Sequence, residues 1–239
     1  DALIVPRDQD GPSSLLVLDA RSGKTRWKVD RDEVTTWNTP LVVEYKGRTQ
    51  IILTATKRIC SYDLADGRLI WQCGGLTVNC IPSAVRFGDS VICMSGYKGA
   101  AAFRIPLDAS GDVTGTDKII WSYKRGTPYV PSPLLTGDRL YFTQTNEPLL
   151  TCLNAKTGEV IMDRKRLSAL SSLYASPVEA AGRIYITDRD GTTLVIERGD
   201  KLKVLSVNRL DEPIDASPAV VGKQLFLRGS KHLYCLEGD

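Results

Sequence analysis

The side chains that most often carry enzyme chemistry are sparse in this chain. Among its 239 residues there is one histidine, His232, which excludes most catalytic and metal chemistry, because dyads, triads and zinc sites usually need an imidazole with a partner. The one string that resembles a calcium loop, residues 188–192, lacks the later ligands and the bidentate glutamate, and we interpret it as an Asp-Gly hairpin turn. We therefore predict no catalytic, cofactor-binding or metal-binding residues.

The six cysteines are too widely spaced for a metal site built from close pairs. The tightest spacing, Cys73 to Cys80, has six residues between the two. These two flank the flexible link Gly74-Gly75, which makes them the best candidates for a disulfide. For Cys152 and Cys235, which share a repeat position, we expect small buried side chains instead.

Composition excludes several classes of protein. The chain is 42% hydrophobic and 25% charged, which argues against disorder and coiled coil. No apolar run approaches the roughly 20 residues of a membrane-spanning helix. Lys and Arg total 31 against 28 acidic residues and are scattered, so we expect no nucleic-acid partner; the oligomeric state stays open.

The elements that must position any site follow from an internal repeat. Residues 18–27, 62–71 and 153–162 share a pattern in which Asp or Asn is followed by a glycine and then, in the first two, by tryptophan. Weaker copies surround Gly111 and Gly199, so that successive glycines are spaced by 44, 44, 47 and 41 residues. The structural repeat positions are Gly23, Trp27, Gly67, Trp71, Trp121 and Gly158.

A second signature, Ser or Thr usually followed by proline, alternates with the first. It occurs at Thr39, Ser83, Ser132, Ser176 and Ser217, and we expect these five at equivalent positions on innermost strands. Between the signatures lie short runs rich in β-branched and aromatic residues, such as 139–143 and 183–187. Each period then holds four short antiparallel strands, which predicts an all-β chain folded as a β-propeller.

We expect one propeller domain over residues 1–239, with four complete blades and two three-stranded partial blades. The first partial blade lacks a first strand and the last lacks a fourth, so we expect the native protein to be longer at its N-terminus. The tryptophans of the outer strands should be buried against neighbouring blades. The expected segments are 1–30, 34–75, 79–124, 128–167, 172–208 and 213–239.

The pattern Leu-Asp-Ala-x-Ser/Thr-Gly-Lys-x-x-Trp resembles the repeat of the pyrroloquinoline-quinone (PQQ) propeller family. That family includes quinoprotein dehydrogenases and the non-enzymatic, BamB-like outer-membrane assembly proteins. The resemblance implies a binding platform or scaffold for proteins, exported to the periplasm. Its dehydrogenases carry two adjacent cysteines and an aspartate base beside calcium, and no Cys-Cys occurs here, so we expect no enzyme and no cofactor. The alternatives are an extracytoplasmic sensor domain and, less favoured, a dehydrogenase fragment.

In a propeller, the loops from fourth to first strands and from second to third strands emerge on one face. Aromatic residues and arginine gather on these loops, which is a signal for recognition of a protein or peptide. The basic pair Lys57-Arg58 on the same face is interpreted as a solvated loop. The candidate partner-binding residues are Trp37, Asn38, Tyr97, Tyr129, Tyr174 and Arg189.

Overall fold

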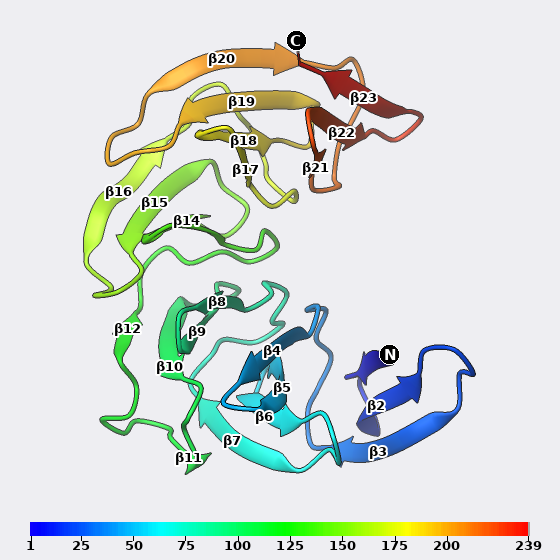
Figure 1. The fold of residues 1–239 in the computed structure, drawn as a ribbon. Helices are drawn as coiled ribbons and strands as arrows, with labels where there is room; N and C mark the ends of the chain where they lie inside the picture. Colours follow the sequence, from blue (N-terminus) through cyan, green and yellow to red (C-terminus); the bar gives the residue numbers. More distant parts are fainter. Residues whose placement is uncertain (239) are drawn as a thin grey trace. The chain divides into compact units, whose positions relative to one another are not determined.

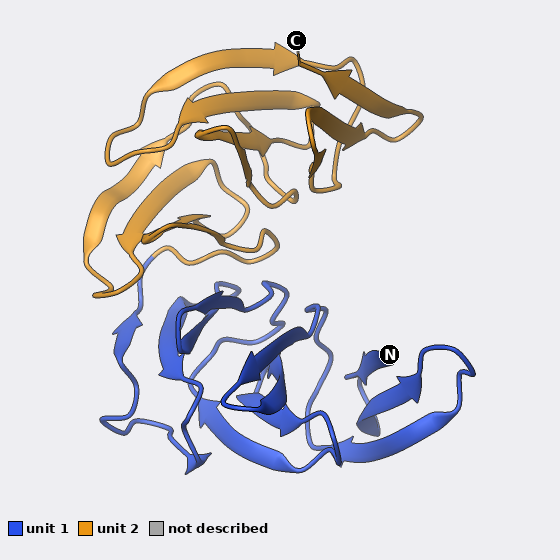
Figure 2. Cartoon of the chain, viewed as in Figure 1, with its two compact units in different colours: residues 1–125 blue, residues 126–239 orange. Residues whose placement is uncertain are grey.

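The computed structural model describes residues 1–238, and every regular element in that range is a β-strand (Figure 1). The strands form six sheets, four of them with at least four strands and two with three, so the predicted propeller fold is confirmed. No helix among the described residues is long and apolar enough to cross a membrane. The chain divides into two compact units, residues 1–125 and the part from Gly126 onward (Figure 2). The single domain stays a prediction.

Unit 1 contains three sheets, in which consecutive strands pair antiparallel except at β11. The first sheet is the three-stranded partial blade, and the next two are complete blades. Its strands are β1 (Ala2–Arg7), β2 (Ser13–Asp19), β3 (Thr25–Arg31), β4 (Leu41–Tyr45), β5 (Arg48–Thr54), β6 (Arg58–Asp63), β7 (Leu69–Gly74), β8 (Val85–Phe87), β9 (Ser90–Ser95), β10 (Ala101–Pro106), β11 (Gly111–Asp112) and β12 (Trp121–Tyr123).

Unit 2 contains two complete blades and a three-stranded sheet at the C-terminal end, again in sequence order. Its strands are β13 (Leu134–Thr136), β14 (Arg139–Thr143), β15 (Leu149–Asn154), β16 (Val160–Arg166), β17 (Val178–Ala180), β18 (Arg183–Thr187), β19 (Thr192–Glu197), β20 (Val204–Arg209), β21 (Ala219–Val221), β22 (Gln224–Arg228) and β23 (Leu233–Glu237).

Strand β11 is an element that the repeat does not predict. It lies in an insertion between β10 and β12 and pairs in parallel with β7 of the preceding blade, with Gly111 opposite Trp71. Gly111 is therefore not an equivalent of the turn glycines Gly23 and Gly67, although its spacing suggested it. The insertion buries Leu107, Ala109 and Val113 in the same core cluster as Trp71.

The glycine signature forms the tight turn between third and fourth strands. In the turn after β2, the Gly23 N–H donates to the carbonyl of Asp19 at 2.8 Å, and the Asp19 carboxylate accepts the N–H of Ser22 at 2.9 Å. Gly67 donates in the same way to Asp63, and Gly158 to Asn154. Gly23 and Gly67 have φ values of +69° and +77°, which non-glycine residues rarely adopt. The turn therefore specifies glycine.

The first tryptophan of the signature, Trp27, packs its blade against the turn of the next. The Trp27 indole N–H donates to the carbonyl of Leu64 at 2.9 Å, and its ring lies on Gly67, where a Cβ would come within 2.8 Å of Cε3. Trp71 and Trp121 are buried, as predicted. Trp27 is only half-buried, so the structure buries it less than predicted. Trp71 differs because the insertion that carries β11 lies against it.

The Ser/Thr signature links neighbouring blades at the entry to their innermost strands. Each of the five residues stands two positions before its strand and not on it, so the predicted placement is wrong by two residues. The backbone N–H of Thr39 donates to the Ser83 hydroxyl at 3.1 Å, Ser132 to Ser176 at 2.9 Å, and Ser176 to Ser217 at 2.9 Å. Each hydroxyl thus accepts the N–H of the equivalent residue one blade earlier. Their shared bonding confirms that these positions are equivalent.

A pair of glycine substitutions tests the contact between Trp27 and the next blade. Gly23→Ala should cost about 1–2 kcal/mol because of its positive φ alone, since no heavy atom lies within 4 Å of the added Cβ. Gly67→Ala should cost about 1–3 kcal/mol more, because its Cβ meets the Trp27 ring. Urea denaturation measures both. Because the added Cβ would also lie 3.0 Å from Val29 Cγ1, a Trp27→Ala background should reduce the excess at Gly67 and not abolish it. Equal losses, or an excess that is undiminished in that background, would contradict the contact.

Candidate functional site

The predicted partner-binding residues all lie in two sets of loops: those joining the fourth strand of one blade to the first of the next (4–1 loops), and those joining second to third strands (2–3 loops). Antiparallel pairing brings both sets to the same ends of the strands within each unit. We call these ends the loop face of that unit. Unit 1 carries Trp37, Asn38 and Tyr97 there, and unit 2 carries Tyr129, Tyr174 and Arg189.

In unit 2 the structure brings Tyr174 and Arg189 together. Arg189, in the 2–3 loop after β18, places its guanidinium carbon 4.0 Å from the ring centroid of Tyr174, in the 4–1 loop before β17. The same guanidinium donates to Asp215, in the following 4–1 loop, with Nε 2.6 Å from Oδ1. Tyr174 is 36% exposed, so the stack faces solvent. One arginine therefore connects two successive 4–1 loops.

The backbone holds this arginine from both sides. The Arg189 N–H donates to the carbonyl of Ser172 at 3.0 Å, and its own carbonyl accepts the N–H of Ile214 at 3.2 Å. Arg189 lies in residues 188–192, which the sequence analysis interprets as a hairpin turn. In this turn the Asp188 N–H donates to the Thr192 carbonyl, and the Asp188 carboxylate accepts the N–H of Thr192 at 2.8 Å. No group of three potential metal ligands occurs in residues 1–238.

The other candidates are separate from this cluster. The Trp37 side chain is 56% exposed, and its backbone N–H donates to the carbonyl of Cys80 at 3.0 Å. Asn38 is buried, with its amide bonded to the carbonyl of Thr54, so it holds its loop in place. The Lys98 ammonium lies over the Tyr97 ring, 5.4 Å from the ring centroid. The Tyr129 N–H donates to Thr145 at 3.1 Å.

The cysteines are free thiols, including Cys73 and Cys80, so the candidate disulfide is not formed. Both are fully buried, and burial raises the pKa of Cys73 to about 11 and that of Cys80 to about 12. Cys152 is buried as predicted, but the prediction is wrong for Cys235, which is exposed. The reason is that β23 is the last strand of its sheet, so no outer strand covers it.

Sequence reasoning missed two buried glutamates that fasten the loops. Glu212 lies early in the 4–1 loop after β20 and accepts hydrogen bonds from the 2–3 loop and from β23 of the sheet that follows. Its carboxylate accepts the Lys231 N–H at 2.6 Å and the Tyr234 hydroxyl at 2.5 Å, and lies 2.9 Å from His232 Nδ1. A Cβ on Gly229 would meet Glu212 at 2.3 Å, so this cradle needs glycine.

Glu33 occupies the same place after β3. Its carboxylate accepts the Lys57 N–H at 3.0 Å and the Arg58 guanidinium at 3.0 Å. The two 2–3 loops that bond to these glutamates have the same backbone hydrogen bond. The Ala55 N–H donates to the Arg58 carbonyl, and the Gly229 N–H donates to the His232 carbonyl. Lys57-Arg58 is therefore not merely a solvated loop. We call these two glutamates the clamps. The signal that could have found both is the repeated Asp-Glu at 32–33 and 211–212, which ends two or three residues after an outer strand.

The two clamps differ in electrostatics. Hydrogen bonds lower the pKa of Glu212 to about 2, that from Tyr234 first and those from Lys231, His232 and Ser230 after it. Burial raises the pKa of Glu33 above its ordinary value, against the opposing effects of the Lys57 N–H and Arg58. Folding therefore favours the ionised form of Glu212 and disfavours that of Glu33.

The comparisons with known proteins agree with this architecture. A PQQ-repeat family model described as "Outer membrane protein assembly factor BamB" matches residues 1–163 and 109–238. The chain belongs to this BamB family. No match was found among curated proteins.

Two solved structures share the fold. The crystal structure of BamB from Moraxella catarrhalis aligns with 98% of this chain and 82% of that one, with a TM-score of 0.54 and 13% identity. The quinohemoprotein alcohol dehydrogenase from Comamonas testosteroni aligns with 89% of this chain but 42% of that one, with a TM-score of 0.59 and 14% identity. The BamB fold is thus also found in an enzyme, and function has to be argued from the site.

The opposite pKa shifts predict opposite pH dependence for two matched variants. Because Glu212 titrates below its unfolded value, its carboxylate stabilises the fold above about pH 4.3, and this contribution is lost as pH falls toward 2. The stability loss caused by Glu212→Gln should therefore shrink between pH 7 and pH 3, whereas that caused by Glu33→Gln should not. Urea midpoints at several pH values measure both, and parallel curves would contradict the assignment.

Proposed function

We propose that this chain is a non-enzymatic propeller scaffold of the cell envelope, exported to the periplasm, that binds a protein partner through its loop face. Membership of a family described as an outer-membrane protein assembly factor supports the compartment and the class of function. The fold also supports the scaffold role, because it presents loops on tightly packed blades, and binding residues often lie on loops that a rigid framework positions.

The single observation that carries the proposal is the Tyr174–Arg189–Asp215 cluster. Tyrosine and arginine supply much of the binding energy in protein interfaces when they are held in place. Here the guanidinium stacks on the ring and is fixed by a carboxylate, while the backbone on both sides of Arg189 is bonded to neighbouring loops. A partner would therefore meet side chains that lose little conformational freedom on binding. Tyr129 is a further candidate on the loop face of unit 2, and Trp37 and Tyr97 are the candidates on the loop face of unit 1.

The likeness to a dehydrogenase gives an enzyme role little support. A quinone site needs a metal to polarise the carbonyl and a base to remove the substrate proton. The sequence has no adjacent cysteines, and residues 1–238 hold no group of three potential metal ligands. The sole histidine is engaged with Glu212. We therefore assign the chain to the scaffold branch.

Matched arginine variants test the binding surface. Arg189→Ala, and separately a Trp37/Tyr129/Tyr174 triple alanine variant, should each reduce recovery of specific partners from envelope extracts at least tenfold, because interface anchors are worth about 2 kcal/mol or more. Arg183→Ala is the control, since this exposed arginine begins β18 at the end away from the loop face. Quantitative mass spectrometry of the captured proteins gives the readout. Identical partner lists from all variants would remove the loop face as the binding surface.

Calorimetric titration tests the non-enzymatic assignment. Added PQQ with Ca²⁺ should give no one-to-one isotherm, because the chain lacks the metal carboxylates and the adjacent thiols that such a site uses. A micromolar or tighter isotherm would contradict the assignment. Titration into a sample unfolded in urea controls for non-specific heat.

A further inference from the structure

The outer strand of each blade is an edge with which another chain could pair, and four of the five outer strands are protected against this. Strands β3 and β16 each carry four charged residues among their seven. Strand β12 has only three residues, and β7 is covered by β11. Charge, shortness and a covering segment are all known ways of keeping an edge from pairing.

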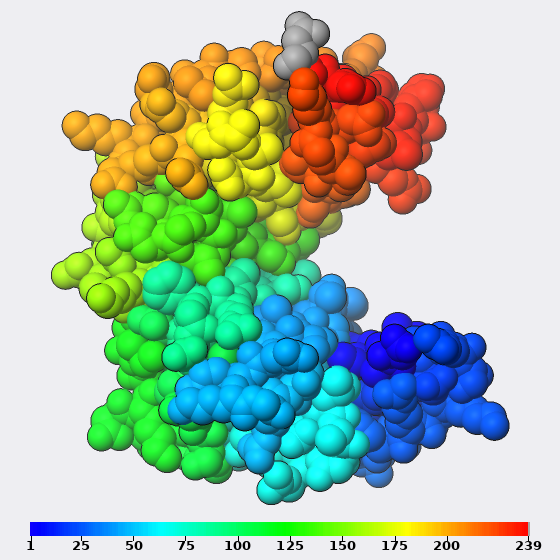
Figure 3. All heavy atoms as spheres, in the orientation of Figure 1, coloured from blue at the N-terminus to red at the C-terminus, as the bar shows by residue number. Residues whose placement is uncertain are grey.

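Strand β20 has none of these forms of protection. Its one charged residue, Arg209, comes last, and all six of its residues are exposed, with Val204 at 49% and Val207 at 52%. The orange atoms of this part of the chain lie on the surface of unit 2 in Figure 3. Among the described residues no strand pairs with the outer side of β20, which we call the β20 edge.

Two other features of the sheets do not account for this edge. The register shift beside Leu205 is not particular to β20, because β3, β7 and β16 have a shift at the same place. Strand β23 is also an edge, but it is a third strand, and in the complete blades that side is taken by a fourth strand of the same sheet.

Strand β7 shows how an outer edge takes up a further segment in this chain. Strand β11 runs beside it in parallel, with Asp112 opposite Gln72. The Gln72 carbonyl accepts the N–H of Val113 at 2.9 Å, and the Gly74 N–H donates to the Thr114 hydroxyl at 2.8 Å. The backbone groups of Gln72 and Gly74 therefore point outward and bind the added segment.

Register places Val207 at the position of Gln72. Counted from the register shift of each blade, both residues are in the second pair, as is Lys28 in β3. The Leu210 N–H donates to the Gly191 carbonyl, on the side of β19. Because the backbone groups of successive residues in a strand point to opposite sides, the N–H and C=O of Val207 point away from β19.

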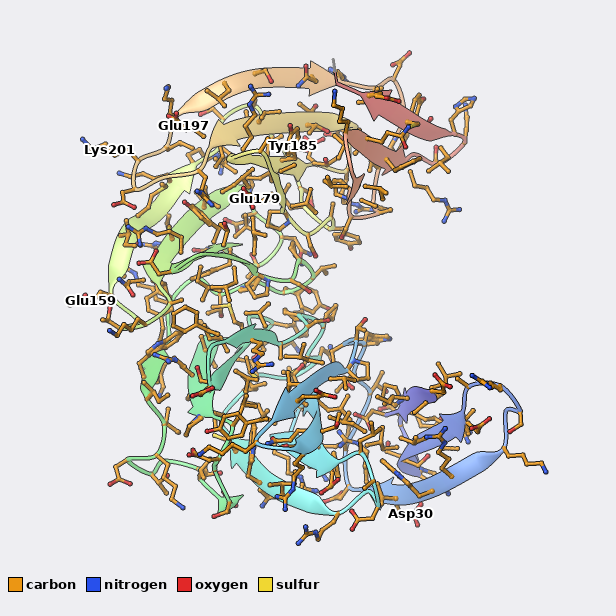
Figure 4. All side chains as sticks on the ribbon, viewed as in Figure 1. Asp30, Glu159, Glu179, Tyr185, Glu197 and Lys201 are labelled. Atoms are coloured by element: carbon orange, nitrogen blue, oxygen red, sulfur yellow. The ribbon has the colours of Figure 1, made fainter. Side chains whose placement is uncertain are left out.

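The charges near the two ends of β20 indicate which segment fits. Lys201 lies in the turn before the strand, where Figure 4 labels it beside Glu197, and Arg209 ends the strand. The acidic residues of that turn are already engaged, Glu197 with Lys203 at 2.9 Å and Asp200 with an arginine of β14 at 2.6 Å. Lys201 and Arg209 thus place a positive charge near each end of the β20 edge.

A second copy of this chain fits the β20 edge poorly. Two β20 strands paired antiparallel over their whole length would bring Arg209 of each copy next to Lys203 of the other. Like charges side by side oppose such pairing. An extended segment with acidic residues on both sides of apolar ones would meet the edge favourably at both ends.

We propose that the β20 edge is a docking site for an extended, acidic segment of a partner protein, which adds to the sheet as a fifth strand as β11 does in the second blade. Backbone hydrogen bonds at Val207 give affinity, and Val204 and Val207 give apolar contact. Lys201 and Arg209 receive the acidic residues at the two ends. The site lies on the outer edge of the blade and not on the loop face, so it goes beyond the proposed function.

A synthetic peptide tests the site in the whole chain. The probe has about six residues, alternating valine and threonine between two terminal glutamates. Fluorescence anisotropy should show one-to-one binding with a Kd of about 0.1 mM or tighter. The same peptide with N-methylated amides keeps its side chains but loses its backbone donors, and should bind at least tenfold more weakly. No binding of the first peptide at about 1 mM, or equal binding of the two, would overturn the proposal.

Proline variants locate the binding at the β20 edge. Val207→Pro removes an outward N–H and leaves the hydrogen bonds to β19 in place, so it should weaken binding at least tenfold. Lys28→Pro, at the same position in β3, is the control and should leave the Kd unchanged. Val207→Thr keeps the backbone donor and should stay within about twofold of wild type. Urea midpoints confirm that the variants fold. Equal Kd values for wild type and Val207→Pro, or equal losses in the proline and threonine variants, would overturn edge pairing.

A charge exchange gives a test that does not depend on β20 tolerating proline. Arg209→Glu should weaken binding of the glutamate-ended peptide about fivefold, and should bind a lysine-ended peptide more tightly than wild type does. Tighter binding of the lysine-ended peptide by wild type would overturn the acidic assignment. Sedimentation of wild type and Val207→Pro should show the same oligomeric state, and a dimer present only in wild type would identify a second copy as the occupant instead.

Discussion

The structure depends on the packing of each blade against the turn of the next. A four-stranded sheet of this size cannot bury both of its faces alone, so its stability comes from contacts with neighbours. The contact between Trp27 and Gly67 shows how closely the two sides are matched, because the ring leaves no room for a Cβ on the turn. This single requirement explains why glycine and tryptophan recur together at one period. It also explains why the repeat weakens where an insertion supplies the burial instead, as beside Trp71.

The loop face follows from the same requirement. A 4–1 loop has to leave an outer strand and reach the innermost strand of the next blade, which places its backbone beside the 2–3 loop of that blade. Glu33 and Glu212 fasten this passage with buried carboxylates that accept backbone and side-chain hydrogen bonds. Arg189 does so with a guanidinium that connects Tyr174 and Asp215. Residues suited to recognition are rigid here because they also hold successive loops together.

The sequence alone predicts the elements that every blade builds in the same way. The glycine turns, the outer tryptophans and the Ser/Thr positions recur because each makes one contact repeatedly, and the strands between them follow from β-branched residues. What occurs once has no period to reveal it. Strand β11 joins the preceding blade through an insertion, and Cys235 is exposed because its sheet ends at β23. The glutamate clamps occur twice among five blade passages, which is too few to stand out as a repeat.

Departures from the repeat show where a junction between sheets is packed differently. A position that holds a large apolar side chain in four blades is a serine in the fifth, on a strand that is exposed along its whole length. At Ser206 the neighbouring positions change with it, since Thr193 and Asn208 replace Leu15 and Val29 while the leucines of the facing sheet remain. One side of the junction has kept its apolar surface and the other has lost the group that covered it. Register thus identifies substituted positions that no motif of the sequence marks.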